Sequence, residues 1–231
     1  MKYLFGPVLS RRLGLSLGVD MVPYKYCSFD CIYCECGPTT VSVVKRHEYV
    51  KSDEIIREVS GFLDSSPELD FVTLAGSGEP TLNASLGKII NHIKDEYPSY
   101  DVALLTNASL LADDAVIEEV KRCDVILPSL DAVSETNFKK INRPGCGLKI
   151  NTIIEGLKKI RARTQCRIWL EVFIVPGIND TDAELRLLKD EIFQINPHKI
   201  QLNTLDRPCS GGDVRPVQHE RMLEISSLFH P

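Results

Sequence analysis

The chain has 231 residues, of which 43% are hydrophobic and 26% are charged, and its net charge is −5. This composition is typical of a globular protein and excludes a disordered or fibrous chain. The acidity argues against a nucleic-acid partner, because proteins that bind nucleic acids usually carry a basic face. A nucleic-acid partner is still open, because an acidic protein can carry a local basic patch.

The beginning of the chain, MKYLFGPVLSRRLG, lacks the apolar core of a signal peptide. No run approaches the roughly 20 apolar residues that a membrane helix needs. We therefore expect a cytoplasmic protein without a membrane partner. In that reducing compartment the eight cysteines indicate metal or redox chemistry rather than disulfides.

Strand-like and helix-like segments alternate along the chain. Six short runs rich in β-branched residues predict strands at 16–23, 70–75, 102–106, 125–130, 167–175 and 199–204, and Pro128 weakens the fourth. A helix is predicted from Ser52, and further apolar stripes at helical spacing cover 86–93, 116–120, 138–141, 150–160, 185–192 and 222–229. Thr181 and Glu184 predict a capping box at the start of one of these helices.

About six βα units without a long linker predict one domain, residues 1–231, built on a parallel sheet covered by helices. Right-handed crossovers leave two outcomes, an open doubly wound sheet or a barrel-like curved sheet. In both, ligands bind beyond the carboxyl ends of the strands. Polar residues follow all six predicted strands, at the cysteine loop, Gly76–Pro80, Thr106–Asn107, Ser129 and Asp131, 176–180, and Asn203, Asp206 and Arg207.

The loop after the first strand carries three cysteines, Cys27, Cys31 and Cys34, within eight residues. A structural zinc site and a cubane iron–sulfur cluster both usually take four protein ligands. Three thiolates that act together therefore leave one coordination position of the metal centre without a protein ligand. That position is open for chemistry. Two other interpretations stay open, a zinc site with a fourth ligand from elsewhere and a chance clustering of buried cysteines.

The spacing C-x3-C-x-aromatic-C, with Tyr33 as the aromatic residue, resembles the signature of the radical AdoMet superfamily. The turn Gly76-Ser77-Gly78-Glu79-Pro80 after the second strand is similar to the GGEP-like turn of that family. The resemblance runs from about Phe5 to Arg207. Within the family, the segments SRRLGLSLGVD, GSGEPTLN, LLTNASLL, PSLDA, INRP and PGIND resemble the branch that contains the tRNA wyosine-forming enzymes and their uncharacterised relatives.

The resemblance implies a partial, open, TIM-barrel-like parallel sheet. It also implies a 4Fe–4S cluster on the three cysteines, whose fourth iron is chelated by S-adenosylmethionine (AdoMet). One electron, from a donor such as flavodoxin or ferredoxin, would cleave AdoMet to methionine and a 5′-deoxyadenosyl radical. That radical would take a hydrogen atom from the substrate.

The resemblance also assigns candidate AdoMet-binding residues. Backbone carbonyls of Gly76, Ser77, Gly78 and Glu79 would receive the methionine ammonium, and glycine permits that close approach. Glu79 has the alternative role of ordering the turn. The remaining candidates are Tyr33 and Val175 for adenine, and Asn107, Ser129 and Asp131 for ribose hydroxyls or the methionine carboxylate. For these, helix capping and core packing are the competing interpretations.

The substrate is unassigned. Arg143, Arg207 and Asn203 lie on the predicted rim and favour a small anionic metabolite or a peptide, whereas the wyosine branch suggests a tRNA base. Glu171 lies within a strand that should be buried, so we expect a ligand or an ion pair for it. Arg11 and Arg12 suit an anion clamp or a solvated surface pair.

The histidines show no ligand spacing and are assigned to no metal. The other five cysteines are expected to be unpaired thiols, and an auxiliary cluster or a redox or radical-relay thiol among Cys36, Cys146 and Cys209 stays open as an alternative. Cys123 and Cys166 should pack in the core, and Cys36, Cys146 and Cys209 come from separate rim loops without ligand spacing. Two functions compete with the enzyme described above. One is an activase that makes a glycyl radical on a partner protein. The other is a non-enzymatic zinc- or cluster-binding regulator in which a protein side chain, for example Cys36, is the fourth ligand of the metal centre.

Overall fold

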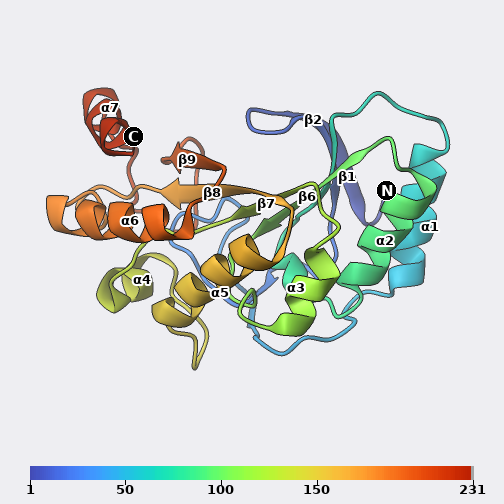
Figure 1. The fold of residues 1–231 in the computed structure, drawn as a ribbon, viewed down its shortest axis with the longest axis horizontal. Coiled ribbons are helices and arrows are strands. Elements are labelled where there is room, and N and C mark those ends of the chain that lie inside the picture. Colours follow the sequence, from blue (N-terminus) through green and yellow to red (C-terminus); the bar gives the residue numbers. More distant parts are fainter. Residues whose placement is uncertain (230–231) are drawn as a thin grey trace.

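A computed structural model describes residues 1–229 and shows one mostly parallel sheet of seven strands (Figure 1). The spatial order is β1-β2-β5-β6-β7-β8-β9, and every neighbouring pair after β1–β2 is parallel. β1 and β9 are edges, so the sheet is open, as predicted. Its strands are β1 (Leu4–Ser10), β2 (Gly14–Val19), β5 (Phe71–Leu74), β6 (Asp101–Thr106), β7 (Val125–Pro128), β8 (Arg167–Phe173) and β9 (Lys199–Asn203).

The antiparallel edge strand β1 was not predicted. Its sequence, LFGPVLS, contains Gly6 and Pro7, which usually mark a turn. An edge strand tolerates proline because one side of its backbone has no ladder partner. Here the register with β2 shifts between Phe5 and Val8, and the bulge accommodates both residues.

Right-handed crossovers place the helices that connect parallel strands on one side of the sheet, and Figure 1 shows α3, α5 and α6 together there. A sheet covered by its connecting helices on one side only is typical of a barrel-like sheet, whereas a doubly wound sheet has helices on both sides. The helices are α1 (Ser52–Leu63), α2 (Leu86–Glu96), α3 (Asp114–Val120), α4 (Glu135–Ile141), α5 (Ile150–Arg163), α6 (Asp182–Ile195) and α7 (His219–Leu228). A 3-10 turn, η1 (Pro80–Leu82), and a two-stranded sheet of β3 (Tyr26–Cys27) and β4 (Val41–Ser42) complete the described elements.

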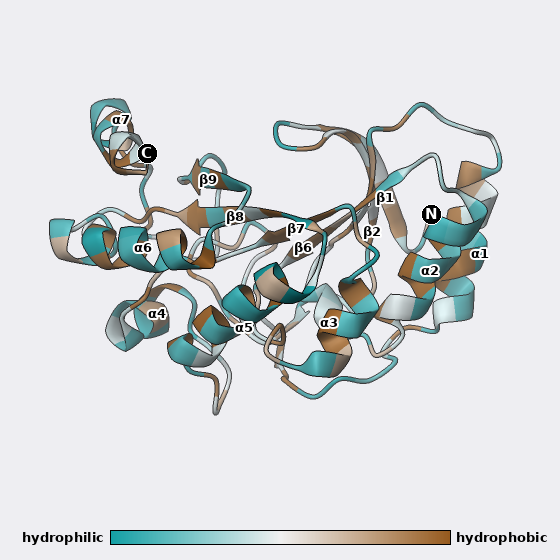
Figure 2. Cartoon of the chain, viewed as in Figure 1, coloured by the Kyte–Doolittle hydropathy of each residue, from teal (hydrophilic) through white to brown (hydrophobic). Residues whose placement is uncertain are grey.

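The main core lies between the sheet and these helices, and the central strands β6 and β7 are correspondingly hydrophobic in Figure 2. A smaller apolar cluster of Leu13, Phe71, Ala103, Val125 and Leu127 covers the opposite face of the sheet. That second face becomes more polar toward the carboxyl ends of the strands. None of the helices within residues 1–229 is long and apolar enough to span a membrane.

Two local predictions need correction. The first parallel strand ends at Val19 rather than at Pro23, because residues 20–25 turn before β3 begins. The capping box is only half formed. Thr181 Oγ1 accepts the Glu184 amide at 3.4 Å, but the Glu184 carboxylate accepts the amides of Val133 and Ser134 at 2.9 and 3.0 Å instead of reaching back. It thereby joins α6 to the segment before α4.

We expect Phe138→Ala to destabilise the fold by about 3–5 kcal/mol, because it empties a buried site between α4 and the cysteine loop. Phe138 is 1% exposed and meets the ring of Phe29 edge-on at 5.4 Å. Urea unfolding of the metal-free protein measures the change. Phe193→Ala, at a side chain 46% exposed, is the matched control and should change the free energy of unfolding by under about 1 kcal/mol. Equal effects of the two would contradict this packing role.

Candidate AdoMet and iron–sulfur site

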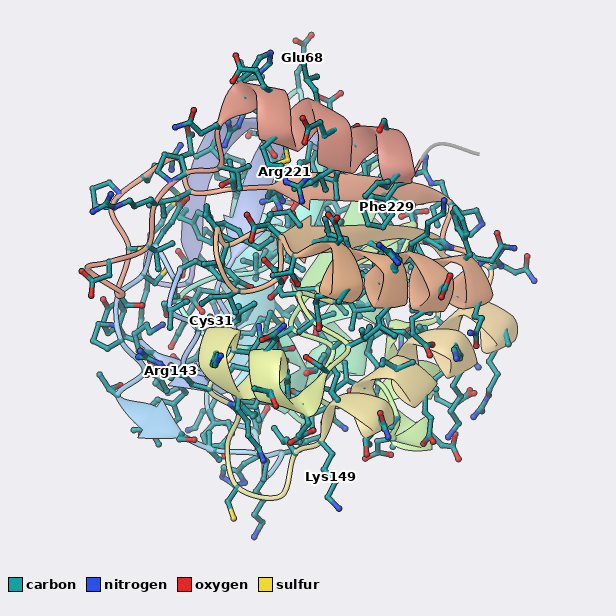
Figure 3. The ribbon with its side chains drawn as sticks, turned by 90° about the vertical axis from the view of Figure 1, so that its left-hand side faces the viewer. Cys31, Glu68, Arg143, Lys149, Arg221 and Phe229 are labelled. Atoms are coloured by element: carbon teal, nitrogen blue, oxygen red, sulfur yellow. The ribbon has the colours of Figure 1, made fainter. Side chains whose placement is uncertain are left out.

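The cysteine loop lies at the edge of the sheet where the parallel strands end. Figure 3 looks onto this edge and labels Cys31 on it. Cys27 belongs to the short strand β3, whereas Cys31 and Cys34 follow in successive turns in which the Cys34 amide donates to the Cys31 carbonyl at 3.1 Å. All three thiols are free and partly exposed. The structure therefore brings the predicted ligands together in one loop.

Each of the three sulfurs receives an N–H donor from a different part of the chain. Lys25 Nζ lies 3.0 Å from Cys34 Sγ. Asn107 Nδ2 and Asn142 Nδ2 each lie 3.5 Å from the sulfurs of Cys27 and Cys31, respectively. Such donors stabilise negative charge on thiolate ligands and are one way in which a protein sets the reduction potential of an iron–sulfur cluster. This donor set fits a cluster.

The three thiols differ in acidity because their surroundings differ. Burial, together with nearby Glu79, raises the pKa of Cys27 to about 11, and burial also raises the pKa of Cys31. The neighbouring Cys36 thiol and the Lys25 ammonium lower the pKa of Cys34 to about 5 against the opposing effect of burial. Cys34 is thus the ligand that ionises most readily.

Within residues 1–229, no three Cys, His, Asp or Glu side chains gather around a position for a single metal ion. A structural zinc site needs all of its ligands around one ion, whereas in a cubane each cysteine binds a different iron.

The glycine turn after β5 packs directly against the cysteine loop. The Glu79 amide donates to the Tyr26 carbonyl at 3.1 Å, and a Cβ on Gly78 would lie 2.1 Å from that same oxygen. Gly76 has φ +147°, and a Cβ there would meet the Asp20 carboxylate at 2.3 Å. Only glycine fits either position, because the turn packs closely against β3 and Asp20. Its contact with AdoMet stays a prediction.

Glu79 orders this turn. Its buried carboxylate accepts the Thr81 and Thr106 hydroxyls, each at 2.6 Å, and the Asn107 amide at 2.7 Å. Burial raises its pKa, whereas these hydrogen bonds favour the ionised form. Glu79 therefore ties the ends of β5 and β6 together, which is the alternative role considered for it from the sequence.

A second buried carboxylate, Asp131, connects β7, β8 and the cysteine loop. It accepts hydrogen bonds from the Tyr33 hydroxyl at 2.6 Å, Asn142 Nδ2 at 2.7 Å and the Phe173 amide at 2.9 Å. Tyr33 is also stacked on Phe173, with ring centroids 3.9 Å apart. Asp131 thus positions Asn142, which in turn donates to Cys31.

The remaining candidate AdoMet-binding residues lie around the same edge. The Asn107 side chain donates to Ser28 Oγ at 2.9 Å, and Ser129 is half-buried at the end of β7. Val175 is 3% exposed, in an apolar cluster with Ile32 and Ile141. Their contacts with ribose and adenine stay predictions.

The candidate substrate residues separate into two places. Asn203 donates to Glu171 at 2.8 Å, and Arg12 forms an ion pair with the same carboxylate on the concave face of the sheet. Arg207 and Arg143 are exposed and lie 3.6 Å from Glu35 and Asp30 of the cysteine loop. The ion-pair alternative for Glu171 is therefore the one seen, and only Asn203 faces the interior.

The loop after β9 covers the cysteine loop. The Ser210 and Gly211 amides donate to the carbonyls of Cys34 and Ile32 at 3.1 and 2.7 Å, and a Cβ on Gly211 would lie 2.6 Å from the Ile32 carbonyl. Of the other cysteines, Cys123 and Cys166 are buried as expected, and Cys36 and Cys146 are exposed.

Sequence reasoning missed Lys25, Asn142, Asn179 and Asp20. Asn179 is fully buried and donates to the carbonyls of Asp131 and Phe173, each at 2.7 Å. Its place after a predicted strand was the available signal, as for Asn107. Lys25 is 2% exposed with φ +58°, and nothing in its sequence neighbourhood distinguishes it from a surface lysine.

Comparison with known proteins settles the family. The Radical SAM superfamily model matches residues 21–188. The chain belongs to the radical SAM superfamily. The cofactors of this family are a 4Fe–4S cluster and AdoMet, and the residues around the cysteine loop fit both.

The chain is also similar to several known proteins and to solved structures. A UPF0026 protein of Methanocaldococcus jannaschii is 32% identical over all of this chain and 72% of its own length. A protein of Brachyspira hyodysenteriae named GTPase Obg is 36% identical, and the chain spans only 33% of its length. A radical SAM methyltransferase from Sphaerobacter thermophilus shares the fold, with a TM-score of 0.68 and 16% identity over 93% of this chain and 63% of that chain. These relatives do not confirm closeness to the wyosine-forming branch.

We expect Lys25→Met to shift the midpoint potential of the bound cluster by about 60 mV toward more negative values, the change equivalent to a factor of ten for one electron. The reason is that a cation beside a ligand sulfur stabilises the more negative, reduced state. Redox titration monitored by electron paramagnetic resonance measures the shift. Lys45→Met, at an exposed lysine, is the control, and equal potentials in the two variants would contradict the role of Lys25.

We expect Gly78→Ala to weaken AdoMet binding by about tenfold or more, since the new Cβ displaces the turn from β3 at a cost of about 1–3 kcal/mol. Calorimetric titration of AdoMet into the reconstituted protein tests this. Gly61→Ala is the matched control, because a Cβ there meets nothing within 4 Å. It should leave binding unchanged and stabilise α1 by about 0.5–1 kcal/mol. Normal AdoMet affinity in Gly78→Ala would exclude the turn from the binding site.

Proposed function

We propose that this chain is an enzyme in which Cys27, Cys31 and Cys34 hold a 4Fe–4S cluster, with AdoMet bound against the Gly76–Glu79 turn. The observation that carries the proposal is the direct packing of this glycine turn on the strand that begins the three-cysteine loop. When bound, the cluster supplies one electron that cleaves AdoMet to methionine and a 5′-deoxyadenosyl radical, which takes hydrogen from substrate.

The surrounding residues position these groups. Lys25 and the two asparagines donate to the sulfurs and stabilise their negative charge. Glu79 holds the glycine turn so that its backbone carbonyls can receive the methionine ammonium. Ser129 is assigned to the ribose because it lies half-buried at the end of β7, next to the strand that carries Glu171. Val175 and Tyr33 supply apolar surface suited to adenine.

The concave face of the sheet is the proposed substrate site. Within residues 1–229, Gln201 Oε1 on β9 is buried without a hydrogen-bond partner. A buried acceptor of this kind is costly unless it is satisfied, which favours a substrate that carries an N–H or O–H donor. The neighbouring Arg12, Glu171 and Asn203 are already paired with one another. We propose a small anionic metabolite or a peptide as the substrate, and an anionic group on it would have to displace Glu171 from Arg12.

Three alternatives remain distinct in what they require. A tRNA base, as in the wyosine-forming branch, needs a nucleic-acid surface around the same opening. A glycyl-radical activase needs a docking surface for its partner protein. A zinc- or cluster-binding regulator needs a fourth ligand from the protein, and Cys36 is available for this role beside Cys34.

We expect the protein, reconstituted anaerobically with iron and sulfide and reduced with dithionite, to form 5′-deoxyadenosine from AdoMet. Chromatography measures the nucleoside. Cys31→Ala should abolish its formation, because the cluster loses a ligand. Cys36→Ala should retain both iron and activity, whereas the regulator alternative requires it to lose the metal. A colourless protein that binds zinc and makes no nucleoside would sink the enzyme proposal.

A further inference from the structure

A protein that cleaves AdoMet reductively must receive an electron at its cluster, so the following inference rests on the proposed function. Electron transfer slows steeply with distance. A protein donor must therefore dock on a surface close to the cysteine loop.

The segment that covers the outer side of the cysteine loop is 141–147, between α4 and α5. The Ile32 amide donates to the Ile141 carbonyl at 2.9 Å, and the Gly145 amide donates to the Ser28 carbonyl at 2.7 Å. Phe29 and Pro144 form an isolated β-bridge. A single layer of backbone therefore separates this surface from the loop that carries Cys27 and Cys31. Figure 3 shows Cys31 and Arg143 close together on the edge where the strands end.

This surface is basic in an acidic protein. Residues 136–154 contain four cations, Lys139, Lys140, Arg143 and Lys149, and no Asp or Glu, although the whole chain has a net charge of −5. All four side chains are exposed. We call these four residues the basic surface.

Two of the four cations are paired with acidic groups, whereas Lys140 and Lys149 form no salt bridge within residues 1–229. Glu135 lies 3.3 Å from Lys139, and Asp30 lies 3.6 Å from Arg143. Exposed pairs of this kind contribute little and exchange readily with a partner's carboxylates. The second Glu135 oxygen accepts the Ile150 amide at 3.2 Å, where α5 begins.

The basic surface also has a hollow in which a partner can seat. An open cavity of about 460 Å³ is lined by Lys139, Arg143 and Lys149, by the acidic Glu135, and by residues 144–148. A second surface cavity, of about 710 Å³, lies over α1–α3 near Lys88 and Glu119 and does not include the cysteine loop. Of these two cavities, the first is the one lined by segment 141–147, whose backbone is hydrogen-bonded to the cysteine loop.

We propose that the basic surface docks a small acidic protein that carries one electron to the cluster. Its charge complements that of an acidic carrier, which steers the encounter and fixes the orientation. In the step itself, the carrier's cofactor is oxidised by one electron and the cluster is reduced by one electron. No bond is formed or broken, and no proton is required.

The test compares two reductants of the reconstituted protein. Reduced flavodoxin is a protein donor that must dock, whereas photoreduced deazaflavin is a small uncharged donor that need not. We expect the second-order rate constant for cluster reduction by flavodoxin to fall about tenfold in K139E/K149E, since reversed charges repel the carrier. Stopped-flow absorbance measures the rate. The wild-type rate should fall as salt is raised, and the variant should lose this dependence.

R57E/R186E is the matched control, because it changes the net charge equally at exposed positions on α1 and α6. It should keep the wild-type rate with both reductants. Equal flavodoxin rates in K139E/K149E and the control would overturn the docking site, and an equal loss with deazaflavin would instead indicate damage to the cluster. If K139E/K149E fails to bind a cluster, the neutral variant K139Q/K149Q is compared with the control in the same way. Nucleoside formation driven by deazaflavin tests the proposed function separately.

Discussion

The constraint around which this edge of the molecule is built is a short loop with three cysteines, which would all carry negative charge as cluster ligands. Ionising several thiols together at a partly buried site is unfavourable unless donors and cations compensate. The protein supplies them from separate elements, as Lys25 just before β3, Asn107 after β6 and Asn142 after α4. The chemistry of the loop thus depends on the positions of several strand and helix ends.

Those ends are held in place by two buried carboxylates. Glu79 joins the turn after β5 to the end of β6, and Asp131 joins β7, β8 and the aromatic residue of the cysteine motif. Each carboxylate is fully surrounded by donors, which is the condition for burying such a group at an acceptable cost. A parallel sheet gathers all these residues at one edge because every strand ends there. The same edge is therefore the one at which we propose the cluster, AdoMet and the electron donor to bind.

In this proposal, substrate and electron donor bind near different sides of the cysteine loop. Its inner side faces the concave surface of the sheet, where the buried Gln201 and the pair of Glu171 with Arg12 lie. Its outer side is covered by segment 141–147 and the basic surface. Substrate and reductant would thus reach the cluster from opposite directions, so that neither blocks the other.

Much of this protein was determined by sequence alone. Periodicity predicted six parallel strands and the helices between them, and the cysteine spacing with the glycine turn predicted the cofactors, since a ligand loop is a local feature of the chain. Only the tertiary structure decided the partners of each sulfur. Lys25 is buried beside Cys34, nine residues away, and Asn142 reaches Cys31 across 111 residues. The edge strand β1 was hidden by Gly6 and Pro7, which are acceptable there only because the sheet leaves one side of that strand unpaired.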